Sequence, residues 1–425
     1  MKDIAEKSLF DIPGGWKTLL WILVLLGIGM FIAGLMTGGE ESVVRTWQAF
    51  LINTVFWGGI AHAGVIFAVI WQITDAKWGR AFKRLAEACA GFLPISFLMF
   101  MVVFFGSHVL YEWTHTPFLH HGEAVKQGWL NLPFFISRNV FWLLLIYGIS
   151  YWFVKTSIKP DIALARRLIG SDWGGKFADW VLEDYGEHET EVIRLEKLSR
   201  KIAPVLALVY SIGGSFLAWD FVMTLDQTWF STLFGVFVMI GNMHAFLGLM
   251  LVVAVTVRQK FGIEEYISIN RLHDLAKMTF AFSLLWTYMG YSQYIVIWYA
   301  DLPEETPYLI IRSMNAPWNT LFLVIILWVF VSVFLGLLPR TLCRMPNYIR
   351  LMGIWVMLGQ LLAVYMMVVP SLQHDGHYHI FMGMHELLIT LGFVGAFFLS
   401  YLAFLGKLPI LPISDKHLCR TWHGH

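Results

Sequence analysis

Long apolar segments recur along the whole of this chain, and they constrain its fold more than any other feature. A helix needs roughly 20 consecutive apolar residues to cross the hydrocarbon core of a bilayer. Ten segments meet that requirement, at 17–37, 46–74, 84–111, 133–154, 202–224, 229–257, 273–300, 317–338, 347–370 and 380–405. Only 14% of the 425 residues are charged, against about 25% in soluble domains. The sequence therefore predicts one all-α integral membrane domain over residues 1–425, with about ten transmembrane helices.

The basic residues predict which side of the membrane each loop faces. Cytoplasmic loops of membrane proteins are rich in Lys and Arg. If the N-terminus is cytoplasmic, only four of the 30 Lys and Arg residues fall on the outer side, namely Arg45, Lys126, Arg138 and Arg312. We therefore expect a multi-pass protein of a bacterial inner membrane with both termini in the cytoplasm. The long segment 155–201 is then a cytoplasmic amphipathic loop, in which Trp180–Leu198 is expected to form a helix on the membrane surface.

Two short motifs suggest an internal repeat. The second span contains Gly-Gly-Ile-Ala-His-Ala-Gly around His62, and the sixth contains Ile-Gly-Asn-Met-His-Ala-Phe around His244. The helix that follows opens with Arg-Leu-Ala-Glu at 84–87 in one case and Arg-Leu-His-Asp at 271–274 in the other. Four spans separate the copies, so both would point the same way across the membrane. We expect two related four-helix bundles, with two flanking helices. Their ranges are 46–224 and 229–370 for the bundles, and 17–37 and 380–405 for the flanking helices.

Ionisable and polar residues inside the spans form three layers. Such groups are costly at membrane depth and mark functional sites. The inner layer includes Glu87 and Asp274, the middle layer His62, His244 and Tyr288, and the outer layer His108, Asp220 and His385, with Arg312 in the loop above. Together they suit a proton route from the inner face to an outer site. A purely structural interpretation stays open, in which the inner acids form ion pairs near the boundary and the histidines hydrogen-bond neighbouring helices.

The sequence offers few ligands for a metal or a haem. The three cysteines, Cys89, Cys343 and Cys419, stand far apart, which argues against an iron–sulfur cluster or other metal site in this chain. His62 and His244 are candidates for one pair of axial haem ligands, but no second pair exists to carry electrons across the membrane. No basic block of the kind that binds nucleic acid is present. The outer loops are rich in histidine, which indicates either a docking face for a partner or ordinary solvated loops. These residues are His108, His115, His120, His121, His374, His377 and His379.

Four stretches of the sequence resemble those of a known family. They are 108–115, 219–235, 272–282 and 292–306, of which the last, Ser-Gln-Tyr-Ile-Val-Ile-Trp-Tyr-Ala-Asp-Leu-Pro-Glu-Glu-Thr, is the most specific. They resemble quinone-interacting membrane subunits of the NrfD/polysulfide-reductase type. The similarity is to the ten-helix branch, which includes subunits of alternative complex III and of the periplasm-facing menaquinone reductase complex of sulfate reducers. It extends over essentially all ten spans.

The resemblance implies a subunit without a redox cofactor of its own, active only within a respiratory complex. It would bind a quinone, expected to be menaquinone, near the periplasmic face and exchange electrons with an iron–sulfur subunit there. Multihaem cytochrome c and molybdopterin-oxidoreductase-like subunits would complete the complex. His108 and Asp220 would hydrogen-bond the quinone oxygens and move protons, and Arg312 and His385 would complete the pocket. The implied proton path consists of Glu87, His62, His244, Asp274 and Tyr288. The direction, quinone reduction or quinol oxidation, depends on the partner.

Two other functions stay open at the level of sequence. Ten spans, a repeat and intramembrane charges also suit a secondary transporter or ion carrier. Such transporters have helices broken by Gly or Pro at matching places in the two halves, and this chain has no such pair. The second alternative is a structural membrane anchor, in which the intramembrane acids could be neutralised without loss of turnover.

Overall fold

The computed structural model describes residues 6, 10, 12–37, 39–116, 119–120, 123–124, 126–373 and 379–415. Nine helical segments within these residues are long and apolar enough to cross a membrane. The chain is therefore an all-α, multi-pass membrane protein, as the sequence predicts. The nine segments are α2 (Gly14–Met36), α3 (Glu40–Thr74), α4 with α5 (Arg80–Phe105), α7 (Leu132–Ile169), α9 with its 3-10 extension (His188–Leu225), α10 (Phe234–Phe261), α13 with α14 (Trp318–Leu337), α15 with its 3-10 extension (Pro346–Leu372) and α16 (Met384–Leu405).

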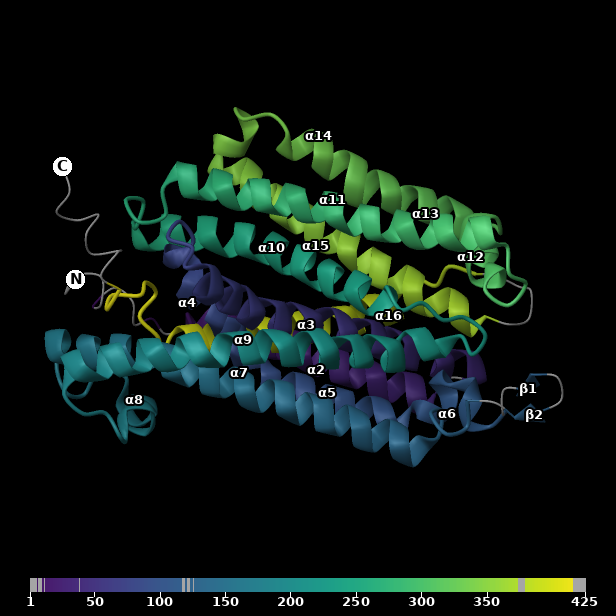
Figure 1. The fold of residues 1–425 in the computed structure, drawn as a ribbon, viewed down its shortest axis with the longest axis horizontal. Helices are drawn as coiled ribbons and strands as arrows, with labels where there is room; N and C mark the ends of the chain where they lie inside the picture. Colours follow the sequence, from purple (N-terminus) through teal and green to yellow (C-terminus); the bar gives the residue numbers. More distant parts are fainter. Residues whose placement is uncertain are drawn as a thin grey trace.

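A further long helix, α11 (Ile269–Ala300), occupies the position of the remaining predicted span. Its 32 residues correspond to roughly 48 Å, more than a bilayer core requires. It lies beside α10 (Figure 1), but Thr, Ser, Gln and Tyr residues along its length keep it out of the set of nine most apolar segments. The Ser268 side chain caps its start by accepting the Arg271 backbone N–H at 3.4 Å. With α11 included, the fold agrees with about ten transmembrane helices.

Short elements lie at the two ends of the helical bundle (Figure 1). The helix α8 (Gly175–Leu182) marks one end, called here the α8 end. The opposite end, called the α12 end, carries α6 (Ser107–Leu110), α12 (Thr306–Ser313) and a small antiparallel hairpin. The hairpin pairs β1 (Leu119–His120) with β2 (Glu123–Ala124).

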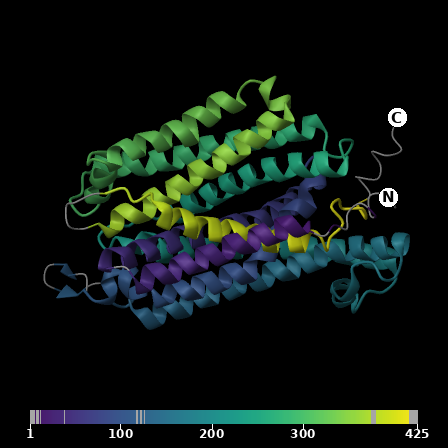
Figure 2. The same cartoon turned by 180° about the vertical axis from the view of Figure 1, so that it is seen from behind.

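The helix α3 forms the centre of the bundle. Its own apolar residues are distributed over all of its faces, which is the pattern of a helix enclosed by other helices. It packs against α5, α9, α10 and α16, while α10 packs in turn against α11 and α15. The helices α2 and α16 form a close pair (Figure 2). A Cβ on Gly27 of α2 would lie 2.5 Å from the Gly392 Cα of α16, so glycine is required for this approach. The division into two repeated bundles stays a prediction.

Most of the predicted cytoplasmic loop 155–201 is helical, because it contains the last part of α7 and the first part of α9. The helix α7 starts after Asn131, whose side chain accepts the Phe134 backbone N–H at 3.0 Å, and continues to Ile169. The helix α9 already begins at His188, and residues 183–187 separate it from α8. The stretch Trp180–Leu198 is therefore partly helical, with the end of α8 and the start of α9 separated by residues 183–187. Sequence hydropathy marks the membrane boundary, whereas these helices continue beyond the apolar stretch.

Candidate functional site

A cavity of about 410 Å³ lies toward the α12 end and is called here the α11 cavity. Ligand-binding pockets in proteins typically measure roughly 300–1,000 Å³. Its walls come from α10, α11, α12, α13 and α15, and they are mostly aromatic and aliphatic. The main lining residues are Trp229, Phe234, Phe237, Trp286, Tyr291, Gln293, Tyr294, Tyr308, Arg312, Phe322, Phe330 and Met366. A flat, largely apolar molecule suits such a lining.

Arg312 supplies the positive charge of this cavity. Its side chain is buried, and its guanidinium lies 3.5 Å from the centre of the Tyr308 ring. It donates to the carbonyl oxygens of Tyr308 (3.1 Å), Met366 (3.2 Å) and Met367 (3.1 Å), and to the Ser371 hydroxyl (2.6 Å). No carboxylate in the described part of the chain forms an ion pair with it. These four bonds leave one of the five guanidinium N–H groups for a ligand, next to a charge that no direct ion pair neutralises.

Two tryptophans of the lining carry indole N–H groups that are enclosed by the protein. The indole Nε1 atoms of Trp229 and Trp286 are buried and have no hydrogen-bond partner among the described residues. An indole N–H can only donate, and a buried donor without a partner is costly. The Trp229 ring also stacks on Tyr308 at 3.8 Å, which fixes this wall. The remaining N–H of Arg312, rather than these enclosed indole groups, is therefore the donor for a hydrogen-bond acceptor on a ligand.

A π-helix forms another part of the wall of the α11 cavity. It covers Ile326–Ser332, between α13 (Trp318–Ile325) and α14 (Val333–Leu337). Ile326 and Phe330 line the cavity from this segment. The Ser283 hydroxyl of α11 donates to the Val329 carbonyl at 2.7 Å and so ties the segment to α11. Single π-helical turns occur frequently at functional sites, which agrees with a site here.

A second cavity, of about 350 Å³, adjoins the first at the α12 end. The two share Trp229 as a wall, and Lys126, Trp129, Trp219 and Asp226 line the second one. The Lys126 ammonium donates to the Gln227 carbonyl at 2.8 Å. Burial lowers the pKa of Lys126, while Asp226 and Glu304 act in the opposite direction. This cavity is thus more polar at its rim than the α11 cavity.

Asp220 does not contact the α11 cavity. It is completely buried and forms a bidentate ion pair with Arg138, with the Nε–Oδ2 distance at 2.6 Å and the Nη2–Oδ1 distance at 2.7 Å. The Asn139 amide adds a third bond at 2.9 Å. The sequence placed Arg138 among the outer basic residues but did not pair it with Asp220. One feature of the sequence could have indicated this pair. The basic residue lies at the outer end of the predicted fourth span, at a depth close to that of the acidic residue in the fifth span.

His108 and His385 also lie away from the α11 cavity. His108 is exposed on α6, and its ring stacks on His115 with centroids 5.2 Å apart. His385 on α16 shares a 2.7 Å hydrogen bond with the Thr46 hydroxyl, next to the Arg45–Glu386 ion pair. Of the four residues expected to contact a quinone, the structure thus places only Arg312 in this cavity. The loop histidines at 120, 121, 374 and 377, as well as Cys419, lie outside the side chains that the structure describes.

The five residues of the expected proton path separate into two groups. His62, His244 and Glu87 are buried inside the bundle. His62 borders a cavity of about 40 Å³, and His244 bonds Gln360 at 2.8 Å. By contrast, Tyr288 is 62% exposed on α11, and Asp274 forms an exposed ion pair with Lys277 at 3.0 Å. Only the buried three can belong to an internal route.

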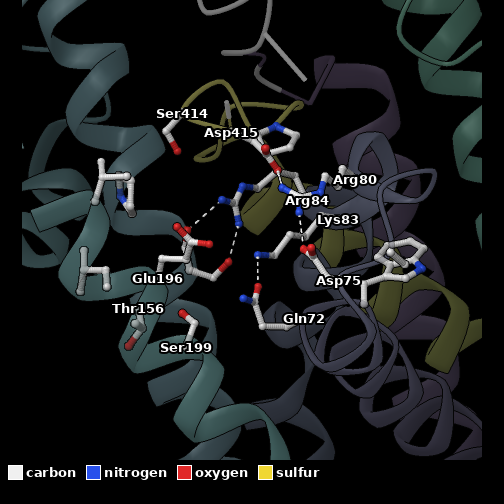
Figure 3. A pocket seen from close by; sticks show the side chains of 17 residues that line it. Gln72, Asp75, Arg80, Lys83, Arg84, Thr156, Glu196, Ser199, Ser414 and Asp415 are labelled. Atoms are coloured by element: carbon white, nitrogen blue, oxygen red, sulfur yellow. Dashed lines mark hydrogen bonds and ion pairs between the residues drawn. The ribbon is translucent and has the colours of Figure 1, made fainter. Parts of the chain in front are cut away.

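A charged pocket of about 160 Å³ lies at the α8 end (Figure 3), and Arg84, one of its lining residues, connects it to Glu87. Arg84 forms ion pairs with Glu87 and with Asp161, the latter at 2.5 Å. Around it, Arg80 bridges Asp75 (2.6 Å) and Asp415 (2.5 Å), and Lys83 donates to Gln72 at 3.1 Å. The second Glu87 oxygen, Oε1, has no partner among the described residues. The structure thus supports the ion-pair interpretation of Glu87, with one oxygen left for a proton or a water molecule.

Known proteins do not identify the chain. No protein-family model matches it, and no curated protein is significantly similar. Among the described residues, no group of three or more His, Cys, Asp or Glu side chains is arranged to hold a metal ion. The α11 cavity is therefore the candidate functional site on its own geometry.

Proposed function

We propose that this protein is the quinone-interacting membrane subunit of a respiratory oxidoreductase complex, and that the α11 cavity binds the quinone ring. The observation that carries this proposal is the combination of an apolar, aromatic-lined cavity with the buried guanidinium of Arg312 in its wall. A quinone is a flat apolar ring with carbonyl acceptors. Reduction places negative charge on those oxygens, and a preorganised cation such as Arg312 stabilises it.

The proposal also assigns each end of the bundle to one side of the membrane. The α12 end would face the periplasm and an iron–sulfur partner subunit that exchanges electrons with the quinone. The α8 end would face the cytoplasm of a bacterial cell, and protons would reach the cavity through Glu87, His62 and His244. If electrons and protons arrive from opposite sides, each charge moved is worth ~2.3 kcal/mol per 100 mV. The chain itself supplies the binding site and the proton route.

Binding of a menaquinone analogue to the purified protein in lipid nanodiscs tests the proposal, with quenching of tryptophan fluorescence as the readout. A hydrogen bond from a charged donor contributes about 1.5–3 kcal/mol, so Arg312→Met is expected to weaken binding roughly 10- to 100-fold. Arg350→Met, at a partly exposed position of α15 outside the cavity lining, is the matched control and should bind as the unmodified protein does. Absence of saturable binding, or equal affinity in Arg312→Met, would overturn the proposal.

A further inference from the structure

The α11 cavity has a mouth between α11 and α13. Tyr291 of α11 lines the cavity and is nevertheless 59% exposed, so it lies at the rim. On the α13 side, Phe322 and Ile326 line the cavity and are also partly exposed. The helix α11 packs against the π-helix and α14 at one edge of the bundle (Figure 1), and the cavity occupies the space between α11 and α13. A molecule in the cavity can therefore reach the outer surface of the bundle sideways, between these two helices.

This mouth opens toward the hydrocarbon core of the membrane. Tyr291 lies roughly 10 Å along the helix axis from the middle of α11, and the hydrocarbon core of a bilayer centred on this helix extends about 15 Å to either side. The residues next to the rim are apolar and exposed, as in a surface that lipid tails cover. They are Leu284, Leu285 and Val296 on α11 and Leu323, Val324 and Leu327 on the α13 side. The mouth therefore admits molecules that are dissolved in the bilayer rather than in water.

The other end of the cavity is closed by the protein. Arg312 is only 5% exposed, and its four hydrogen bonds hold it in the wall. Toward the second cavity, the Trp229 ring stacked on Tyr308 forms the partition. Beside it, the Ser231 hydroxyl of the second cavity donates to the Gln293 Oε1 atom of the α11 cavity at 3.1 Å. The α11 cavity thus has a closed end that carries a charge and an open end that is apolar.

We propose that the mouth is a lateral portal for a ligand with an acceptor-bearing ring and a long apolar tail, and that the tail leaves the cavity beside Tyr291. That the ring is a quinone rests on the function proposed above, and the tail is then its isoprenoid chain. A ring carbonyl that accepts the remaining N–H of Arg312 leaves the tail at the open end, where hydrocarbon surrounds it and keeps it out of water. Tyr291 is therefore a positioning residue, which contacts the tail and not the reacting oxygens.

Nitroxide spin labels on single cysteines test the portal, in the full chain in nanodiscs and in a Cys419→Ser background. At Tyr291→Cys, collisions with molecular oxygen, which concentrates in hydrocarbon, are compared with collisions with a water-soluble nickel chelate, and we expect oxygen to dominate. A menaquinone with its isoprenoid tail should remove most of this oxygen accessibility, whereas menadione, a similar ring without a tail, should leave it unchanged. Tyr288→Cys is the matched control, because this exposed residue of α11 lies outside the cavity lining, and its label should respond to neither compound.

The outcomes separate the portal from the quinone function, because quenching of tryptophan fluorescence in the unlabelled variants shows whether the menaquinone binds. Collisions dominated by the nickel chelate at Tyr291→Cys overturn the portal, since the mouth then opens to water. If the menaquinone binds and the label stays accessible, the portal fails while the quinone site stands. If only Tyr291→Cys loses binding, Leu323→Cys on the opposite side of the mouth takes its place. If the unmodified protein does not bind the menaquinone, the quinone function fails, and oxygen-dominated collisions still support a portal that opens to the bilayer.

Discussion

At the scale of single residues, the Arg138–Asp220 ion pair yields the sharpest prediction about stability. Both side chains are buried, and removal of one partner leaves an uncompensated charge. Arg138→Met is expected to lower the free energy of unfolding by about 3–5 kcal/mol. Thermal unfolding of the purified protein in detergent measures the change. The double variant Arg138→Met/Asp220→Asn should recover part of the loss, because it removes the stranded charge.

The Arg200–Glu196 pair provides the control for this prediction. Its side chains are 56% and 55% exposed, so Arg200→Met should change stability by no more than about 0.5 kcal/mol. Equal losses in Arg138→Met and Arg200→Met would contradict the assignment of a buried ion pair. The sequence could predict that Asp220 needs a partner, because a charge at membrane depth must be compensated. It could not select Arg138, 82 residues away, because the rotation of each helix decides which side chains meet.

At the scale of helices, the α2–α16 pair depends on close backbone approach. Gly27→Ala places a Cβ 2.5 Å from the Gly392 Cα, and the backbone must move to relieve the overlap. Overpacking of this kind costs about 1–3 kcal/mol. Gly29→Ala on the same helix meets nothing within 4 Å and is the matched control. We expect a lower thermal midpoint for Gly27→Ala only; a similar loss in both variants would argue against this packing.

The lengths and order of the helices were largely predictable, because the apolar stretch must match the bilayer thickness. The extensions of α7 to Ile169 and of α9 from His188 were not, because helix beyond the bilayer carries no apolar pattern. The candidate site shows the same limit. Apolar and aromatic residues such as Phe237 and Trp286 look alike in sequence whether they face lipid or line a cavity. The sequence-based prediction of the quinone site therefore relied on ionisable residues. Of the four residues predicted to contact the quinone, only Arg312 lies in the α11 cavity.

At the scale of the whole molecule, the proposal depends on which end of the bundle faces the cytoplasm. The charge distribution predicts that the α8 end faces the cytoplasm, since only four basic residues fall on the other side of the membrane. Single cysteines at exposed positions test this in a background in which Cys419 is replaced by serine. The remaining Cys89 and Cys343 are buried. Ser171→Cys reports on the α8 end, and Leu302→Cys, next to α12, reports on the opposite end.

A membrane-impermeant maleimide should label Ser171→Cys in inverted membrane vesicles only and Leu302→Cys in right-side-out vesicles only. The reverse result would place the α11 cavity toward the cytoplasm and the charged pocket at Glu87 toward the periplasm. The sides from which protons and electrons reach a bound quinone would then be exchanged. Quinone reduction would dissipate membrane potential in that orientation, whereas it stores membrane potential in the proposed one. For a given direction of the reaction, the sign of energy conversion by the complex therefore follows from this topological measurement.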